Sequence, residues 1–117
     1  MNNKDLIEKA VSAIKIKKIK DYLIGDVGCA LVTSKDNIYL GVSAAIDANT
    51  FCAEKNAIGS MLTAGEYKIK KIVTVWKDKK NNICIIPPCG NCRQLIKQVD
   101  KDNLETGVIL DKNKFAS

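Results

Sequence analysis

The sequence predicts an α/β fold in which helices pack against a mixed β-sheet, and three observations lead to this prediction. No linker rich in Pro, Gly or Ser interrupts the 117 residues, which indicates a single domain over residues 1–117. Hydrophobic residues make up 46% and charged residues 27%, as is typical of a globular chain. Segments with helical spacing alternate with short β-rich runs in the order α-β-β-α-β-α-β.

The first part of the chain is expected to form a helix and then a β-hairpin. Apolar residues recur at helical spacing and predict an amphipathic helix over residues 4–19. The almost continuous apolar run 27–32 predicts a central strand that is covered on both faces. Residues 34–37 are expected to turn, and residues 38–42 to return as the second strand of the hairpin.

The second part of the chain is expected to contain two more helices. A helix is predicted over residues 50–64, capped by Thr50 and stopped by Gly65. β-branched residues predict a strand over residues 69–76, followed by a polar turn. Residues 83–86 form a short apolar run that Pro87-Pro88 ends, and the remaining expected elements are a helix from about residue 89 and a last strand over 108–110.

The absence of histidine excludes several kinds of chemistry. A Ser-His-Asp or Cys-His nucleophile cannot be built, and neither can a zinc site that needs imidazole ligands. A metal ion must therefore be bound by sulfur and carboxylate groups. Protons must be moved by Glu, Asp, Lys, Tyr or Cys.

Charge and hydropathy indicate the surroundings of the protein. The net charge is +6 but aromatic residues are only 5%, which favours a solvated basic surface over a nucleic-acid groove. The first residues contain no apolar segment of the kind that signal peptides have, and no run approaches the ~18 apolar residues of a membrane span. We therefore expect a cytoplasmic protein with reduced cysteines and no membrane partner.

Two cysteine-bearing turns carry the chemical information. They read Cys52-Ala53-Glu54 and Pro88-Cys89-Gly90-Asn91-Cys92-Arg93-Gln94. Each is expected to open a helix, where the positive helix end favours thiolates. Three thiolates, from Cys52, Cys89 and Cys92, are one ligand short of a closed structural site. Three protein ligands with an open position are typical of catalytic zinc.

Charged neighbours of these cysteines have predicted roles as well. Glu54 is expected to take a proton from metal-bound water and to pass it to the substrate. Three thiolates around Zn²⁺ leave a net negative charge at the site. We expect the cationic side chains of Lys55 and Arg93 to offset this charge.

Together the two turns resemble the signature of the zinc-dependent cytidine deaminase superfamily, [His/Cys]-x-Glu followed by Pro-Cys-x-x-Cys. The Cys-Ala-Glu variant resembles the branch that acts on free nucleosides, which includes cytidine deaminases and blasticidin-S deaminases. Residues 27–31 and 38–41 are also similar to the first hairpin of this family. The resemblance covers about residues 20–110.

The resemblance implies a fold, a cofactor and a reaction. The fold is a three-layer αβα sandwich around a mixed sheet, and the cofactor is Zn²⁺ held by Cys52, Cys89 and Cys92. A zinc-bound hydroxide attacks C4 of a cytidine-like nucleoside or aminopyrimidine antibiotic, Glu54 protonates N3 and then the amine, and ammonia leaves. Small cytidine deaminases form homotetramers in which neighbouring subunits complete the sites, so a homotetramer is implied here.

The resemblance also points to substrate-binding positions. Backbone groups near Ala53 are implied to bind the exocyclic amine, and Phe51 is a candidate wall of the pocket. The family's ribose-binding Asn and Glu correspond to Gly41 and Ser43, so that Ser43 offers one hydroxyl in place of a carboxylate. The family's pocket phenylalanine corresponds to Gly25. These departures favour the blasticidin-S deaminase side of the branch.

Two alternatives remain open at this point. The first is a non-catalytic module with a Cys₄ structural zinc, in which Cys29 or Cys84 is the fourth ligand. Both cysteines lie among apolar neighbours, however, where a buried thiol acts as a small hydrophobic group. The second is a nucleic-acid-editing deaminase, although editing members usually carry His in place of Cys52.

Overall fold

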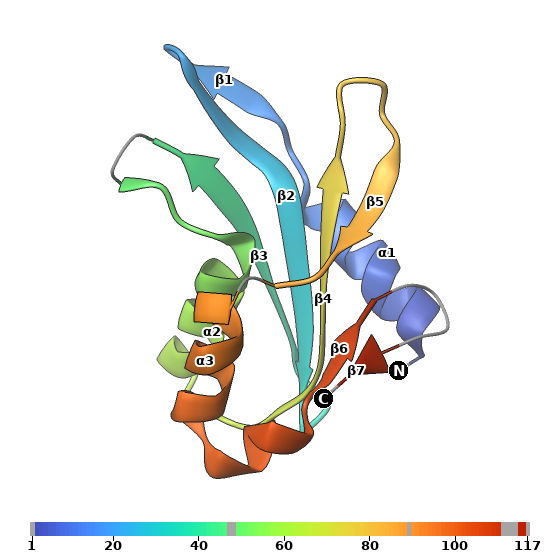
Figure 1. The fold of residues 1–117 in the computed structure, drawn as a ribbon, viewed down its shortest axis with the longest axis vertical. Helices are drawn as coiled ribbons and strands as arrows, with labels where there is room; N and C mark the ends of the chain where they lie inside the picture. The colour runs from blue at the N-terminus through green and yellow to red at the C-terminus, as the bar shows by residue number, and fades with distance from the viewer. Residues whose placement is uncertain (1, 47–48, 89, 111–114, 117) are drawn as a thin grey trace.

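The computed structural model describes residues 2–46, 49–88, 90–110 and 115–116, which form one mixed β-sheet with helices on both faces (Figure 1). In chain order the elements are α1 Asn3–Ala13, β1 Lys17–Ile19, β2 Tyr22–Thr33, β3 Ile38–Ala45, α2 Ala53–Thr63, β4 Ile69–Lys77, β5 Ile83–Ile86, α3 Gly90–Val99, the 3-10 helix η2 Lys101–Glu105, β6 Gly107–Ile109 and β7 Phe115–Ala116. Helix α1 covers one face of the sheet, and helices α2 and α3 cover the other. This arrangement confirms the predicted αβα sandwich.

Strand β2 lies at the centre of the sheet. It pairs antiparallel with β1, β3 and β4. Strand β4 pairs antiparallel with β5 and parallel with β6, which makes the sheet mixed. Strand β7 extends the sheet antiparallel to β6 and was not among the predicted elements. The register places Cys29 on β2 opposite Thr74 on β4, and this pair lies below the site described in the next section.

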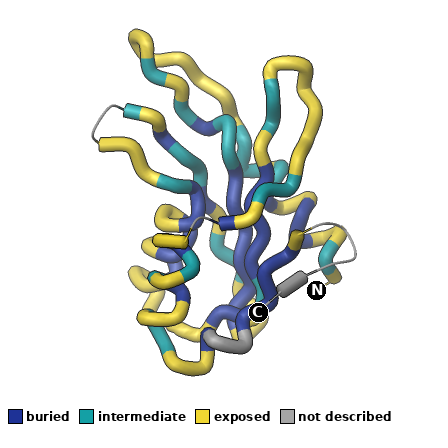
Figure 2. The backbone as a smooth tube through the Cα atoms, viewed as in Figure 1, coloured by how far each residue is buried: buried dark blue, intermediate teal, exposed yellow. Residues whose placement is uncertain are grey.

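Two hydrophobic clusters fix the helices to the sheet. The cluster under α1 consists of Leu6, Ile7, Ala10, Ala30, Val32, Val73, Val75 and Ile109. The cluster under α2 and α3 consists of Cys29, Leu31, Ala53, Ala57, Ile58, Met61, Ile69, Ile72, Ile96 and Val108. Alternate residues of β2 and β4 belong to opposite clusters, as the period of two in a strand requires. Figure 2 shows that buried residues are concentrated where the helices cover the sheet, whereas the β1–β2 and β4–β5 hairpins are mostly exposed.

The predicted first helix is wrong at its C-terminal end. Helix α1 ends at Ala13, and residues Lys17–Ile19 pair with β2 instead of continuing the helix. The sequence from Ile14 to Lys17 alternates apolar and charged residues, a period of two that suits a strand. The local sequence is thus compatible with a helix or a strand, and the pairing of Lys17–Ile19 with β2 makes it a strand. Lys20, with φ of 56°, forms the turn into β2.

The predicted cap of the second helix is also wrong. Helix α2 begins at Ala53 with Cys52 as its N-cap residue. Thr50 instead accepts a hydrogen bond on Oγ1 from the Ile46 N–H at 3.0 Å. At the other end, Gly65 follows α2 with φ of 85°, a left-handed conformation that glycine adopts without strain.

Strand β3 and helix α2 are in close contact at Gly41. A Cβ at this position would lie 2.4 Å from the carbonyl oxygen of Ala53 and 2.4 Å from the backbone nitrogen of Ala57. Both are backbone atoms, so a side chain at residue 41 would have to displace the helix. The absence of a side chain therefore sets the position of the first turn of α2 on the sheet.

Gly41→Ala is therefore expected to destabilise the protein by about 1–3 kcal/mol, as overpacking of a core does. Gly59→Ala is the matched control, because a Cβ at Gly59 would contact nothing within 4 Å. This control is expected to stabilise α2 by about 0.5–1 kcal/mol. Urea unfolding of the two variants measures both values. Equal stability of Gly41→Ala and the wild-type protein would contradict the close contact.

The three α-helices are short, with 11 residues in α1, 11 in α2 and 10 in α3. A membrane-spanning helix needs about 20 predominantly apolar residues. In the part of the chain that the structure describes, no helix is both long enough and apolar enough to cross a membrane.

Candidate metal centre

Three side chains with metal-ligating groups meet where helices α2 and α3 begin. The Sγ atoms of Cys52 and Cys92 and a carboxylate oxygen of Glu54 all lie within 4.8 Å of one another. Glu54 and Cys92 are buried, and Cys52 is half-buried. The structure therefore brings together the two turns that the sequence analysis singled out. Cys89, the third predicted cysteine ligand, lies outside the described residues.

The local structure explains why these groups converge. Cys52 is the N-cap of α2, and Cys92 lies in the first turn of α3. The two helices contact each other on one face of the sheet and begin at the same level (Figure 1). Backbone N–H groups and the positive end of each helix favour the thiolate form of a cysteine there. Two sulfur donors with an adjacent carboxylate suit the coordination preferences of zinc.

The side chain of Glu54 is oriented by Thr74, which lies on strand β4 of the sheet beneath it. The Thr74 hydroxyl donates a buried hydrogen bond of 3.1 Å to Oε1 of Glu54. This contact orients the carboxylate within the site. Thr74 was not among the predicted site residues, although it is the one hydroxyl in the run Ile72-Val73-Thr74-Val75. A lone polar residue in a buried strand needs a hydrogen-bond partner. This requirement is the sequence signal that could have identified Thr74.

The neighbour of Thr74 across the sheet is the thiol of Cys29. Burial raises the pKa of Cys29, the negative charge of Glu54 raises it further, and the hydrogen bond with Thr74 lowers it in part. The thiol therefore stays protonated at neutral pH and adds no charge beneath the carboxylate. Cys29 is fully buried, as predicted.

The prediction that Cys84 is buried is wrong. Cys84 is exposed on β5, in the hairpin that extends beyond the helices (Figure 2). Apolar neighbours in the sequence do not bury a residue when no helix covers its strand. Among the described residues, the group that could hold a metal ion contains neither Cys29 nor Cys84.

The other predicted site residues lie around the cluster. Ala53 is buried directly after Cys52, and Phe51 is exposed directly before it. Phe51 and Ala44 form an antiparallel bridge that ties this segment to β3. Ser43 is half-buried on β3.

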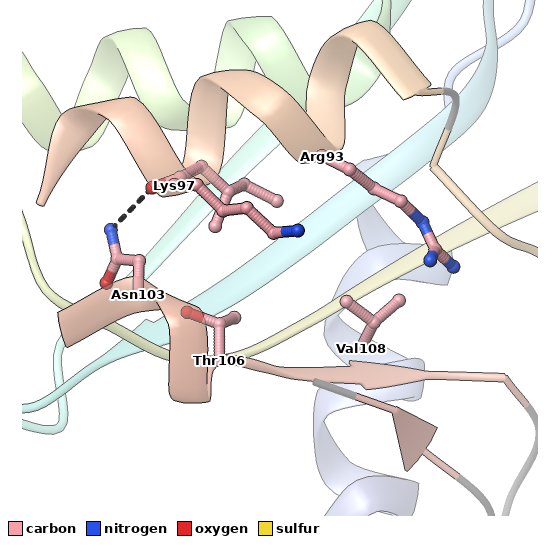
Figure 3. A pocket seen from close by; sticks show the side chains of 6 residues that line it. Arg93, Lys97, Asn103, Thr106 and Val108 are labelled. Atoms are coloured by element: carbon pink, nitrogen blue, oxygen red, sulfur yellow. Dashed lines mark hydrogen bonds between the residues drawn. The ribbon is translucent and has the colours of Figure 1, made fainter. Parts of the chain in front are cut away.

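The two predicted charge-balancing residues lie in different environments. Lys55 is exposed on α2. Arg93 is half-buried and lines a small cavity of about 30 Å³ between α3 and β6, together with Thr106 and Val108. Its guanidinium group extends toward Val108 (Figure 3). In the same cavity, the Asn103 side chain donates to the carbonyl oxygen of Ile96 at 3.0 Å.

Comparisons with known proteins give a consistent result. The family model of the cytidine and deoxycytidylate deaminase zinc-binding region matches residues 1–107. The blasticidin-S deaminase of Bacillus cereus is 32% identical over 108 residues, which cover 87% of this chain and 77% of that protein. The cytidine deaminase of Mycoplasma genitalium is 32% identical over 71 residues, which cover 58% of this chain and 51% of that protein.

Solved structures share the fold. The cytidine deaminase from Burkholderia pseudomallei superposes with a TM-score of 0.73 at 27% identity, over 99% of this chain and 91% of that chain. The enzyme from Mycobacterium leprae superposes with a TM-score of 0.76 at 20% identity, over 99% and 92%, and so bears on the fold alone. The predicted resemblance is thus confirmed, and the chain belongs to the cytidine and deoxycytidylate deaminase family of hydrolytic deaminases.

Proposed function

We propose that the protein is a zinc-dependent deaminase of a free cytidine-like nucleoside or an aminopyrimidine antibiotic. The observation that carries the proposal is the convergence of Cys52, Cys92 and Glu54 at two helix N-termini. Relatives named cytidine deaminase and blasticidin-S deaminase support the class of substrate. The reaction consumes one water and releases ammonia.

Cys52, Cys89 and Cys92 would hold the zinc ion, which leaves Glu54 for proton transfer. When bound, zinc supplies a Lewis acid that lowers the pKa of water and so provides a nucleophile at neutral pH. Ala53 directly follows Cys52, and backbone groups near it would bind the exocyclic amine of the substrate. Lys55 and Arg93 remain the candidates for balancing the charge of the thiolates.

Glu54 performs the proton transfers in this proposal. One oxygen, Oε1, accepts the Thr74 hydrogen bond, and the other oxygen is left to exchange protons with water and substrate. The carboxylate takes a proton from the attacking water and delivers it to N3 of the ring. It then takes the remaining proton from the hydroxyl added at C4 and gives it to the amine, so that the C4–N bond breaks, ammonia leaves and C4 becomes a carbonyl. General acid–base catalysis of this kind contributes roughly 10²–10⁴-fold to a rate.

Thr74 is expected to position Glu54 for these steps. A hydrogen bond to a charged group contributes about 1.5–3 kcal/mol. Thr74→Val removes it with little change in volume, so kcat should fall roughly 10- to 100-fold with KM nearly unchanged. Thr74→Ser restores the hydroxyl and should recover most of kcat. Steady-state kinetics of the two variants measure this difference.

Thr63→Val is the matched control for Thr74→Val. The Thr63 hydroxyl donates to the Gly59 carbonyl on the exposed side of α2, so its loss should leave kcat unchanged. If Thr74→Ser were as slow as Thr74→Val, the hydroxyl would not be the group that matters.

The proposed function is tested by offering the zinc-loaded protein four substrates. Cytidine, deoxycytidine, cytosine and blasticidin S are each incubated with the protein, and ammonia release is measured. Release from at least one of them supports the proposal, and the order of kcat/KM identifies the substrate. No release from any of the four, at full zinc content, would overturn it.

A further inference from the structure

Asp26, Ser43 and Trp76 form a hydrogen-bonded group across three neighbouring strands, which we name the Asp26 cluster. Oδ1 of Asp26 accepts a hydrogen bond from the Ser43 hydroxyl at 3.3 Å. Oδ2 accepts one from the Trp76 indole N–H at 3.2 Å. The carboxylate is therefore oriented from both sides. Each carboxylate oxygen can accept a further hydrogen bond.

A bulge in β2 brings Asp26 into this position. Ile24 pairs with Ala44, and Gly28 pairs with Val42, so residues 25–27 stand opposite Ser43 alone. Gly25, with φ of 81°, allows the extra residues to be accommodated. Bulges of this kind change the direction of a side chain and are frequent beside active sites.

The Asp26 cluster lies on the same face of the sheet as the metal centre. Side chains two residues apart in a strand point to the same face. Ser43 follows Gly41 by two residues, and Gly41 packs against the first turns of α2. Trp76 follows Thr74 by two residues, and Thr74 donates its hydrogen bond to Glu54. Because Asp26 bonds to both Ser43 and Trp76, its carboxylate is on this face too.

The separation between the Asp26 cluster and the metal centre suits a nucleoside. Two residues along a strand span about 7 Å, which is the offset of Trp76 from Thr74. On the other side, the bridge between Ala44 and Phe51 brings the next residue, Cys52, level with Ser43. The sugar of a nucleoside whose pyrimidine ring lay at the metal centre would therefore be within reach of Asp26.

The surface beside Asp26 has room for a ligand. Asp26 and Trp76 line a groove of about 340 Å³ between the β1–β2 and β4–β5 hairpins, together with Leu23 and Lys77. This volume is in the range of small-molecule sites. The Trp76 side chain is 39% exposed and is held by its bond to Asp26, so part of the indole is available for contact.

We propose that Asp26 is a specificity-determining residue whose carboxylate accepts a hydrogen bond from the 2′- or 3′-hydroxyl of the bound nucleoside. The inference rests on the proposed function and assigns the part of the site that binds the sugar. Ser43, itself a predicted substrate-binding residue, then acts as a positioning residue, since its hydroxyl proton is directed to Asp26. A carboxylate selects groups that donate hydrogen bonds and repels phosphate groups.

Asp26→Asn tests the proposal with cytidine and 2′,3′-dideoxycytidine as paired substrates. Asn can keep both contacts, because its Oδ1 can accept from Trp76 and its Nδ2 can donate to Ser43. Only the negative charge is lost. We expect kcat/KM for cytidine to fall roughly 10- to 100-fold, the cost of a charge-assisted hydrogen bond. For dideoxycytidine it should change by less than about 2-fold, since that substrate lacks the 2′- and 3′-hydroxyls.

A matched control and a second measurement complete the test. Asp21→Asn makes the same charge change at an exposed turn of the β1–β2 hairpin and should affect neither substrate. Trp76 is the one tryptophan of the chain, so its emission reports binding without turnover. Titration with uridine and dideoxyuridine should show the same selectivity, and Asp26→Asn should remove it.

The outcomes separate this inference from the proposed function. Equal losses on both substrates would show that Asp26 has only a structural role, and an unchanged value for cytidine would show that it has none in binding. Either result overturns the inference alone, because the wild-type protein is active in both cases. A wild-type protein that deaminates no pyrimidine overturns the proposed function, and this inference with it.

Discussion

Glu54→Gln is expected to stop deamination while the protein keeps its zinc. Gln has nearly the same size and its amide oxygen can still accept the hydrogen bond from Thr74, so the geometry around residue 54 is preserved. The amide cannot exchange protons at neutral pH. We expect kcat to fall by at least roughly 10²–10⁴-fold. Ammonia release gives the rate, and atomic absorption gives the zinc content of the same sample.

The matched control is Glu8→Gln, which makes the same change on the exposed side of α1. This variant should retain the full rate. An active Glu54→Gln protein would sink the assignment of the proton shuttle. Loss of zinc together with activity would instead make Glu54 a metal ligand, which its distance from the two sulfur atoms also permits.

The second large effect is expected for Cys92→Ser, which replaces a buried thiol with a hydroxyl group. Cys92 lies in the first turn of α3 with its Sγ in the candidate metal-binding group. A serine oxygen at this position is a poor zinc ligand at neutral pH. Zinc affinity should fall by more than the roughly 10- to 100-fold that changes outside the ligand set produce. Activity should fall in parallel, and excess zinc should partly restore it.

Cys84→Ala is the matched control for Cys92→Ser, because Cys84 is exposed on β5. Its zinc content and activity are expected to equal those of the wild-type protein. Cys29→Ala tests the buried cysteine under Glu54 in the same assay. A variant of Cys29 or Cys84 that lost both zinc and folding would support the alternative of a structural Cys₄ site. Full zinc content in both variants would eliminate it.

The strongly periodic segments were predictable from the sequence. The expected strand over 69–76 corresponds to β4 within a residue, since a β-branched run bounded by polar turns has few other solutions. The apolar run over 83–86 forms β5, which the predicted order of elements did not include. The expected helix over 4–19 ends early, at Ala13. The residues from Ile14 to Lys17 are compatible with the spacing of a helix and with the alternation of a strand. Only the pairing with β2, which is a tertiary interaction, makes that segment a strand.

The residues of the candidate site also fall into those that the sequence predicted and those that it did not. Cys52, Glu54 and Cys92 belong to two local motifs, and the resemblance of this motif pair to a family signature was enough to predict that they meet. Thr74 and Asp26 come from strands and act through the register of the sheet, which spacing does not reveal. The exposure of Cys84 was missed for a related reason. Its burial depends on which strands the helices cover, and the residues next to it in sequence carry no such information.

The close contact at Gly41 limits how the specificity of this protein can be altered by protein engineering. Any side chain introduced there must move the backbone of α2, and that helix carries Glu54, the carboxylate proposed for proton transfer, and has the predicted metal ligand Cys52 as its N-cap. A library that varies this position would therefore trade new substrate contacts against turnover. Asp26 and Trp76 lie on strands β2 and β4 and not on this helix, so these two positions are where a search for altered sugar preference should begin.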